Sequence, residues 1–176
     1  VEFHPAYHEL MGLAFGAGLH SLAWTAKKEG GFAARAALNY LWNQGEQGIS
    51  CPVTMTFAGV QVLRNAPALA AEWEPKLTAR AYDPRPLPVA QKAGATIGMA
   101  MTEKQGGSDL RANSTVAVRD AGASGTFLLT GHKWFCSAPM CDGFLALARL
   151  DDRVTCFFVP RSLPDGTRNP FYIQRL

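Results

Sequence analysis

The sequence lacks the features that define several large classes of protein. No apolar run approaches the roughly 18 residues that a membrane-spanning helix needs. Its first residues, VEFHPAYHEL, carry acids and histidines where an export signal has a basic start and an apolar block. The net charge of +3 is spread over the chain, without the basic stripe of a nucleic-acid-binding surface. With 48% hydrophobic residues the composition is globular, so we expect a cytoplasmic protein that makes no membrane contact.

Cysteine and histidine are too few and too scattered to indicate a metal site. No C-x-x-C pair is present, and His4 and His8, one helical turn apart, have no third ligand at a suitable spacing. Apolar surroundings such as TCFFV favour buried, reduced thiols over ligands or disulfides. We therefore predict no metal, and free thiols at Cys51, Cys136, Cys141 and Cys156.

The first half of the chain shows the spacing of helices. Apolar residues recur every three or four positions, beginning with Tyr7, Leu10 and Met11. Ser50-Cys51-Pro52 reads as a helix entry, because proline is tolerated in a first turn. The pattern predicts helices over residues 7–23, 32–44, 53–64 and 68–78, in a helical N-terminal domain over residues 1–92.

After a proline-rich connector at residues 83–88, the pattern changes to strands and turns. Because strands and helices do not alternate, Rossmann and P-loop architectures are disfavoured and an α+β fold is predicted. The chain begins without methionine and ends on a predicted strand, so we expect both domains to be incomplete parts of a larger protein. The predicted strands of the second domain, residues 93–176, are 95–101, 114–119, 126–130, 133–137, 144–150, 154–159 and 172–176.

The segment MAMTEKQGGSD, residues 99–109, carries the first chemical signal. Small residues and hydroxyls directly after a strand let a backbone approach a ligand closely. The amides of Gly106-Gly107-Ser108 could hold a phosphate, although an ordinary turn would look similar. No Lys-Ser/Thr follows as in a P-loop, and no helix opens as in a dinucleotide-binding motif.

A second segment, Gly131-His132-Lys133-Trp134-Phe135-Cys136-Ser137, follows one hairpin later. Together, the Thr-Glu segment (residues 99–109) and the Gly-x-Lys segment (residues 131–137) resemble the acyl-CoA dehydrogenase superfamily of flavoproteins. The wording MTEKQGGSD, GHKWF and CFFVPR is similar to its adaptive-response, AidB-type branch. The resemblance implies a helical N-terminal domain, an antiparallel β-barrel or sandwich middle domain, and a helical C-terminal domain that this sequence lacks.

The resemblance implies FAD as cofactor and assigns roles to specific residues. Thr102 and Ser137 would bond the pyrimidine edge and N5 of the flavin, and Phe135 would lie against its rings. Gly107 and Ser108 would meet the diphosphate or an acyl-CoA. Met99 and Met101 would contact the ring, although methionine is common in any core, and Cys136 belongs to the same cofactor-binding set. Glu103 and Asp109 are expected to be local caps or ion pairs.

The family reaction is α,β-dehydrogenation of an acyl-CoA, with a hydride passing to flavin N5. The resemblance places the catalytic Glu in the C-terminal domain, so no base is named here and this chain alone should be inactive. A homotetramer is implied for the full-length protein. Three alternatives stay open: an AidB-type flavoprotein that binds and protects DNA through a region absent here, an oxidase acting on another acidic carbon compound, and a domain without cofactor.

Overall fold

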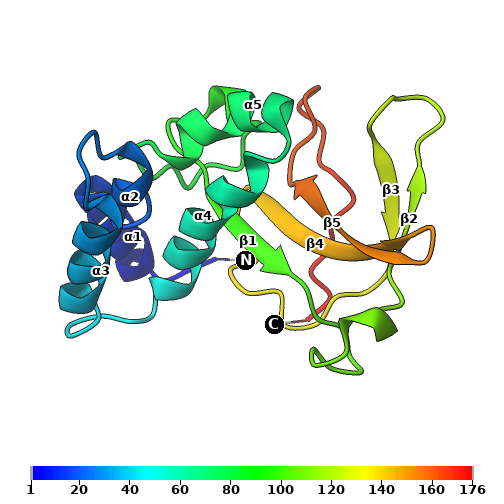
Figure 1. The fold of residues 1–176 in the computed structure, drawn as a ribbon, viewed down its shortest axis with the longest axis horizontal. Coiled ribbons are helices and arrows are strands. Elements are labelled where there is room, and N and C mark those ends of the chain that lie inside the picture. The colour runs from blue at the N-terminus through cyan, green and yellow to red at the C-terminus, as the bar shows by residue number, and fades with distance from the viewer. Residues whose placement is uncertain (1, 176) are drawn as a thin grey trace.

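The computed structural model describes residues 2–175, in which a group of helices precedes a sheet (Figure 1). The helices are α1 (Pro5–Ala17), α2 (Leu22–Thr25), α3 (Gly31–Trp42), α4 (Ser50–Leu63) and α5 (Pro67–Leu77). All four predicted helical segments are present, but the first is divided in two. Gly18 ends α1 with a φ of 76°, a left-handed conformation that caps the last carbonyls and breaks the predicted run to residue 23.

Five strands form one mixed sheet: β1 (Ile97–Ala100), β2 (Val116–Arg119), β3 (Phe127–Thr130), β4 (Gly143–Leu150) and β5 (Arg153–Pro160). The α+β class is confirmed. The sheet differs from an antiparallel one because β1 and β2 both run parallel to the central strand β4, whereas β2–β3 and β4–β5 are antiparallel pairs. Within residues 2–175 the strand order β1-β4-β2-β3, with β5 also on β4, does not close into a barrel.

Two predicted strands are wrong within the described residues. Residues 133–137 form a loop, because Phe135 and the nearby Ala138 have φ values of 56° and 50°, which an extended strand does not accommodate. Residues 172–175 are also irregular, and Leu176 lies outside the described residues. Phe171, directly before this segment, stacks on Phe144 of β4 with 4.5 Å between ring centroids, so a side-chain contact and not strand pairing holds the chain to the sheet there.

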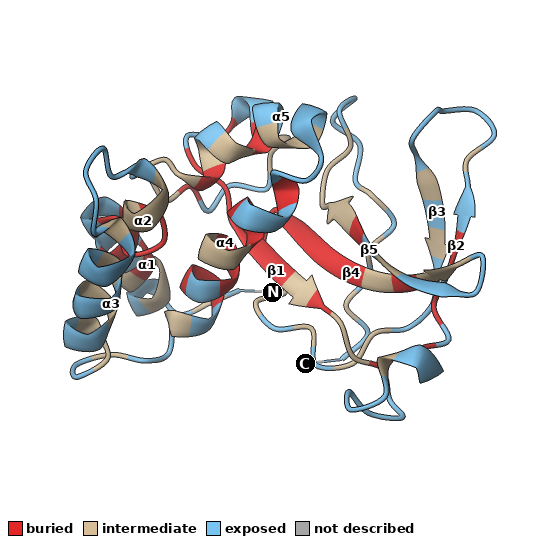
Figure 2. Cartoon of the chain, viewed as in Figure 1, coloured by how far each residue is buried: buried red, intermediate tan, exposed pale blue. Residues whose placement is uncertain are grey.

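The main core lies between the sheet and helices α4 and α5 (Figure 2). Val60 and Leu63 of α4 and Trp73 and Leu77 of α5 are buried against Ile97 and Leu145. A second cluster, around Met11, Phe15 and Leu19, holds the helices together. Helix α4 is also bonded to β1, because the buried Thr56 hydroxyl accepts a hydrogen bond of 3.1 Å from the Ile97 amide. This packing fixes β1, and with it the start of the Thr-Glu segment.

The connector between the halves is anchored by a buried ion pair. Lys92 Nζ lies 2.5 Å from Asp142 Oδ1 and also donates to the Arg85 carbonyl. The second carboxylate oxygen of Asp142 accepts bonds from the amide and hydroxyl of Thr96. Burial raises the pKa of Asp142, while Lys92 opposes that shift. The proline-rich connector therefore leads into a fixed polar contact at the beginning of β4.

All four thiols are free, as predicted, but their predicted burial is only partly right. Cys141 is buried and Cys136 half-buried, whereas Cys51 and Cys156 are exposed. Among residues 2–175, no three His, Cys, Asp or Glu side chains are arranged to hold a metal ion. No helix in the described part of the chain has the length and apolar character that crossing a bilayer requires.

Candidate functional site

The Thr-Glu and Gly-x-Lys segments, far apart in sequence, pair with each other in the structure. Met99 and Ser137 form an antiparallel bridge. Three residues further on, Trp134 donates its amide to the Thr102 carbonyl at 3.0 Å, and the Thr102 hydroxyl donates to the Trp134 carbonyl. Both contacts fit one antiparallel register. Thr102 and Ser137 therefore lie on the same short ribbon, separated by roughly 10 Å along it.

The buried side chain of Glu103 holds the paired Thr-Glu and Gly-x-Lys segments together. Its carboxylate is 2% exposed and accepts hydrogen bonds from the amides and hydroxyls of Ser114 and Thr115. Lys133 Nζ completes the set at 2.9 Å. Burial by itself would raise the pKa of Glu103, but the bonds from Thr115, Lys133 and Ser114 outweigh it and hold the pKa well below its usual range. The predicted role of Glu103 in an ion pair agrees with this geometry.

Close packing against Thr115 explains why the Gly-x-Lys segment has a glycine at position 131. A Cβ on Gly131 would lie 2.3 Å from Thr115 Oγ1, the hydroxyl that bonds Glu103. A larger residue at position 131 would displace that hydroxyl. Gly131 and Lys133 therefore both support the buried carboxylate of Glu103, the glycine by leaving room for Thr115 and the lysine by pairing with the charge.

The glycine-rich part of the Thr-Glu segment folds back on Thr102. A turn brings the Gly106 amide to the Glu103 carbonyl at 2.9 Å. A Cβ on Gly107 would approach the Thr102 methyl to 2.7 Å, so the Gly107 backbone packs directly against Thr102. Gly107 and Ser108 are exposed, and their amides bond no other described residue. Asp109 caps the following turn (Leu110–Ala112) through the Arg111 amide, as expected of a local cap.

Phe135 projects from the paired segments into solvent. Its side chain is 82% exposed. In the pairing register it lies opposite Met101. Because residues 133–137 are a loop, strand alternation does not separate the two neighbouring aromatic rings, and Trp134 packs edge-on to Phe135 with centroids 6.0 Å apart. The Phe135 ring therefore presents an aromatic face to solvent, with the polarised π surface that can stack on another ring.

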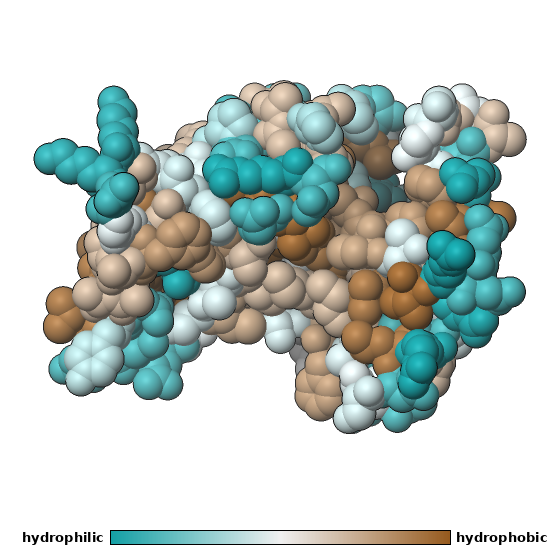
Figure 3. Space-filling model, viewed as in Figure 1, coloured by the Kyte–Doolittle hydropathy of each residue, from teal (hydrophilic) through white to brown (hydrophobic). Residues whose placement is uncertain are grey.

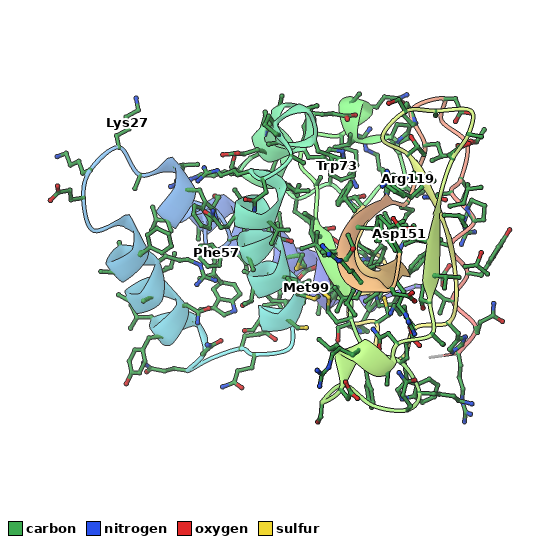
Figure 4. The ribbon with its side chains drawn as sticks, turned by 45° about the vertical axis from the view of Figure 1, so that its right-hand side comes forward. Lys27, Phe57, Trp73, Met99, Arg119 and Asp151 are labelled. Atoms are coloured by element: carbon green, nitrogen blue, oxygen red, sulfur yellow. The ribbon has the colours of Figure 1, made fainter. Side chains whose placement is uncertain are left out.

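The remaining predicted residues divide into two environments. Met99, labelled in Figure 4 beside α4 and the sheet, packs with Met101 on the main core while both stay partly exposed. Ser137 is exposed, and its hydroxyl bonds no other described residue. Phe135 and half-buried Cys136 line a wide cavity of about 1590 Å³, which also borders β3 and β5. The lining of that cavity does not include Thr102, Ser108 or Ser137.

The structure also shows supporting residues that the sequence did not predict. Asn113 is fully buried and donates from Nδ2 to the Met101 carbonyl at 2.9 Å. Ser114 and Thr115 bond Glu103, as described above. A run of three polar residues directly before a strand was a signal that could have indicated buried hydrogen bonds. The motif marks Lys133 as a position of the Gly-x-Lys segment, but only the structure shows it as the partner of Glu103.

Two family models match the chain. The adaptive response protein AidB N-terminal domain matches residues 1–84, and the acyl-CoA dehydrogenase middle domain matches residues 98–171. Over its whole length the chain is 47% identical to the putative acyl-CoA dehydrogenase AidB of Escherichia coli (strain K12), of which it spans 32%. It is also 37% identical to acyl-CoA dehydrogenase family member 11 of Caenorhabditis elegans over 64% of this chain and 18% of that relative.

Solved structures give the same result for the fold. The structure titled Bd2924 apo-form superimposes with a TM-score of 0.84 at 28% identity, over 99% of this chain and 35% of that one. A glutaryl-CoA dehydrogenase from Mycobacterium smegmatis in complex with FADH2 has a TM-score of 0.65 at 20% identity, covering 95% of this chain and 42% of that chain. The chain belongs to the acyl-CoA dehydrogenase superfamily. Its similarity to AidB covers both the helical and the sheet part.

Proposed function

We propose that this chain forms the flavin-facing part of an FAD-dependent acyl-CoA dehydrogenase-like protein. The observation that carries the proposal is the antiparallel pairing of the Thr-Glu and Gly-x-Lys segments, which holds Thr102, Gly107 and Ser137 in a fixed relationship. Superfamily membership supports it, and one solved relative by fold is titled as a complex with FADH2. The chain spans 32% of its AidB relative, so the activity of the whole protein is part of the proposal.

The exposed groups fit the chemistry of this cofactor. Phe135 offers an aromatic face, and the Ser137 hydroxyl and Thr102 oxygen lie along the same ribbon. The amides of Gly107 and Ser108 can donate to an anionic diphosphate, because they bond no other described residue. Bound FAD would accept the hydride removed from an acyl-CoA thioester. The residues of this chain would orient the ring system, and Phe135 would exclude water from one side of it.

Glu103 does not fit the role of catalytic base. Both oxygens of its carboxylate already accept hydrogen bonds from Ser114, Thr115 and Lys133. The side chain is buried, and its pKa is held below the usual range. A general base must reach the proton that it removes and bind it. We propose that the base is a glutamate of the part of the protein beyond this chain. The alternative of DNA binding concerns a region outside this chain, and it stays an open alternative.

Two-dimensional ¹H–¹⁵N NMR of the labelled chain, titrated with FAD, tests the proposal even if affinity is low. We expect the amide signals of Gly107, Ser108, Phe135 and Ser137 to shift together. Phe135→Ala should weaken the response by roughly three- to tenfold, the contribution of one aromatic contact. Val118→Ala, a similarly exposed apolar site on β2, is the matched control. No shifts at saturating FAD, or shifts confined to other residues, would refute the flavin site.

A further inference from the structure

Four buried polar atoms in the helical part have no hydrogen-bond partner among residues 2–175. They are His20 Nδ1 and Ser21 Oγ, in the turn between α1 and α2, and Arg35 Nη2 and Asn39 Oδ1 of α3. His20 and Ser21 are both 0% exposed. Because buried polar atoms are nearly always bonded, a group of such atoms indicates a bound water or ion. We call these four residues the inner polar cluster.

Contacts between the α1–α2 turn and α3 bring the inner polar cluster together. Arg35 donates from Nε to the carbonyl of Leu19, the residue directly before His20, at 3.1 Å. Asn39 follows Arg35 by one helical turn and lies on the same side of α3. Both are half-buried, whereas the solvent side of α3 is mostly apolar, tan to brown at the left of Figure 3. The polar side of α3 therefore faces the turn that carries His20 and Ser21.

The positive charge at this cluster is not balanced by an acid. Neither Arg35 nor Arg80 belongs to an ion pair of the described residues. The Arg35 guanidinium lies 3.6 Å from the centre of the Phe57 ring, labelled in Figure 4, and burial lowers its pKa. Arg80 reaches the same turn, since a Cβ on Gly18 would lie 3.2 Å from Arg80 Nε. A partly buried guanidinium keeps its proton and favours an anionic partner.

His20 contributes a hydrogen-bond acceptor to the cluster. Its Nε2 lies 3.0 Å from the Ala79 carbonyl, which can only accept, so Nε2 carries the proton. Nδ1 of the neutral ring then presents a lone pair. Burial lowers the pKa of His20 to about 4 and the charges of Arg35 and Arg80 add to this shift, although the bond to Ala79 opposes it. The ring is therefore neutral at pH 7.

The four atoms together define the chemistry of a ligand. Arg35 Nη2 donates, the Ser21 hydroxyl can donate or accept, and the other two atoms, His20 Nδ1 and Asn39 Oδ1, accept. Chloride would satisfy only the donors, and water would leave the charge of Arg35 unbalanced. An anion whose oxygens accept and which also carries a hydroxyl group matches both the charge and the mixture of donors and acceptors.

We propose that the inner polar cluster binds a small hydroxyl-bearing oxyanion, bicarbonate or hydrogen phosphate, between the α1–α2 turn and α3. Arg35 and Ser21 would donate to its oxygens, and Asn39 or His20 would accept from its hydroxyl. The bound anion would connect the turn to α3, a helix that has no buried residue of its own. None of these residues belongs to the Thr-Glu or Gly-x-Lys segment, so the site is independent of the proposed flavin contacts.

Two-dimensional ¹H–¹⁵N NMR of the labelled chain tests the proposal, with sodium bicarbonate, sodium phosphate and sodium nitrate added at constant ionic strength near neutral pH. Nitrate has the planar shape and single charge of bicarbonate but no hydroxyl. We expect the amide signals of His20, Ser21 and Asn39 to shift saturably with bicarbonate or phosphate. Nitrate should bind about fivefold more weakly, because one hydrogen bond is lost. The lower dissociation constant identifies which of the two hydroxyl-bearing anions is the ligand.

Arg35→Met should weaken this binding at least about tenfold, because it removes the charge and keeps a long side chain beside the Phe57 ring. Arg64→Met is the matched control. Arg64 lies 4.9 Å from the centre of the neighbouring Trp24 ring, but its charge is already paired with Glu74, so anion binding should be unchanged. Circular dichroism checks that each variant keeps its helices.

Ser21→Ala is a smaller change and should weaken binding roughly fivefold, so it tests the site even if Arg35→Met fails to fold. A wild-type chain without saturable shifts overturns the proposal, because the cluster then holds only water. Equal affinities for nitrate and bicarbonate overturn the requirement for a hydroxyl. Unchanged affinity in both Arg35→Met and Ser21→Ala overturns the placement of the site, as do shifts found at Gly107 and Ser108 instead of the cluster.

Discussion

The carboxylate of Glu103 and the ammonium of Lys133 lie 2.9 Å apart, with side-chain exposures of 2% and 13%. This contact joins the strand end that carries Thr102 to the loop that carries Phe135 and Ser137. The same carboxylate accepts hydrogen bonds from the backbone amides of Ser114 and Thr115. The acidic residue of one motif and the basic residue of the other are therefore parts of one structural unit. The proposed cofactor contacts depend on it.

Replacing Glu103 by Gln should destabilise the chain by about 3–5 kcal/mol, because Lys133 loses its buried anion. Urea unfolding measures the loss. Glu74→Gln is the matched control, since its pair with Arg64 is more exposed, at 27% and 38%, and should cost less than about 1 kcal/mol. Equal losses in the two variants would contradict a special role for the buried pair.

The contribution of Glu103 should disappear in acid. Its pKa in the folded chain lies below its usual value of 4.5, so its stabilising effect is complete above that pH and is lost as the pH falls toward the folded pKa. We expect the difference in unfolding free energy between wild type and Glu103→Gln to be constant near neutral pH and to shrink below pH 4.5. Asp83, whose pKa is also lowered, contributes to both proteins and cancels. A difference that grew on acidification would refute this assignment.

Gly107→Ala should loosen the paired segments. The new Cβ would press on the Thr102 methyl at 2.7 Å, and rotating Thr102 away would break its hydroxyl bond to the Trp134 carbonyl. Hydrogen exchange of the Trp134 amide should accelerate about tenfold, because the loss of one hydrogen bond makes local opening easier by about 1 kcal/mol. Gly45→Ala, whose added Cβ would meet its nearest neighbour only at 3.9 Å, should leave Trp134 unchanged. Unaltered exchange in both variants would argue against the close contact.

The four thiols should react with Ellman's reagent at different rates. Cys51 and Cys156 are both exposed, but desolvation by neighbouring atoms raises the pKa of Cys156, so Cys51 should react first. Burial raises the pKa of Cys141 to about 12, so that thiol should react only when the chain unfolds. Cys51→Ser should remove the fast phase. A fast phase that survives this change would show that another thiol is the accessible one.

The helices and most strands could be predicted because each depends on local pattern. Spacing located α3, α4 and α5 to within a few residues, and Pro52 and Pro67 lie in first turns where proline is tolerated. The strand predicted at residues 133–137 failed for a non-local reason. Its backbone follows the Thr-Glu segment through the Trp134–Thr102 and Ser137–Met99 contacts, and Phe135 takes a left-handed conformation that no propensity indicates.

The sequence by itself determined the class of fold, the order of the elements and the family, because these follow from hydrophobic spacing and from motif residues read in order. Only the tertiary structure decided what each motif residue contacts. The burial of Glu103 against Lys133, the approach of Gly107 to Thr102 and the exposure of Phe135 all join or separate residues distant along the chain. Local propensity acts over a few residues, whereas such contacts depend on the path of the whole backbone and on how β1 is held against α4 and β4.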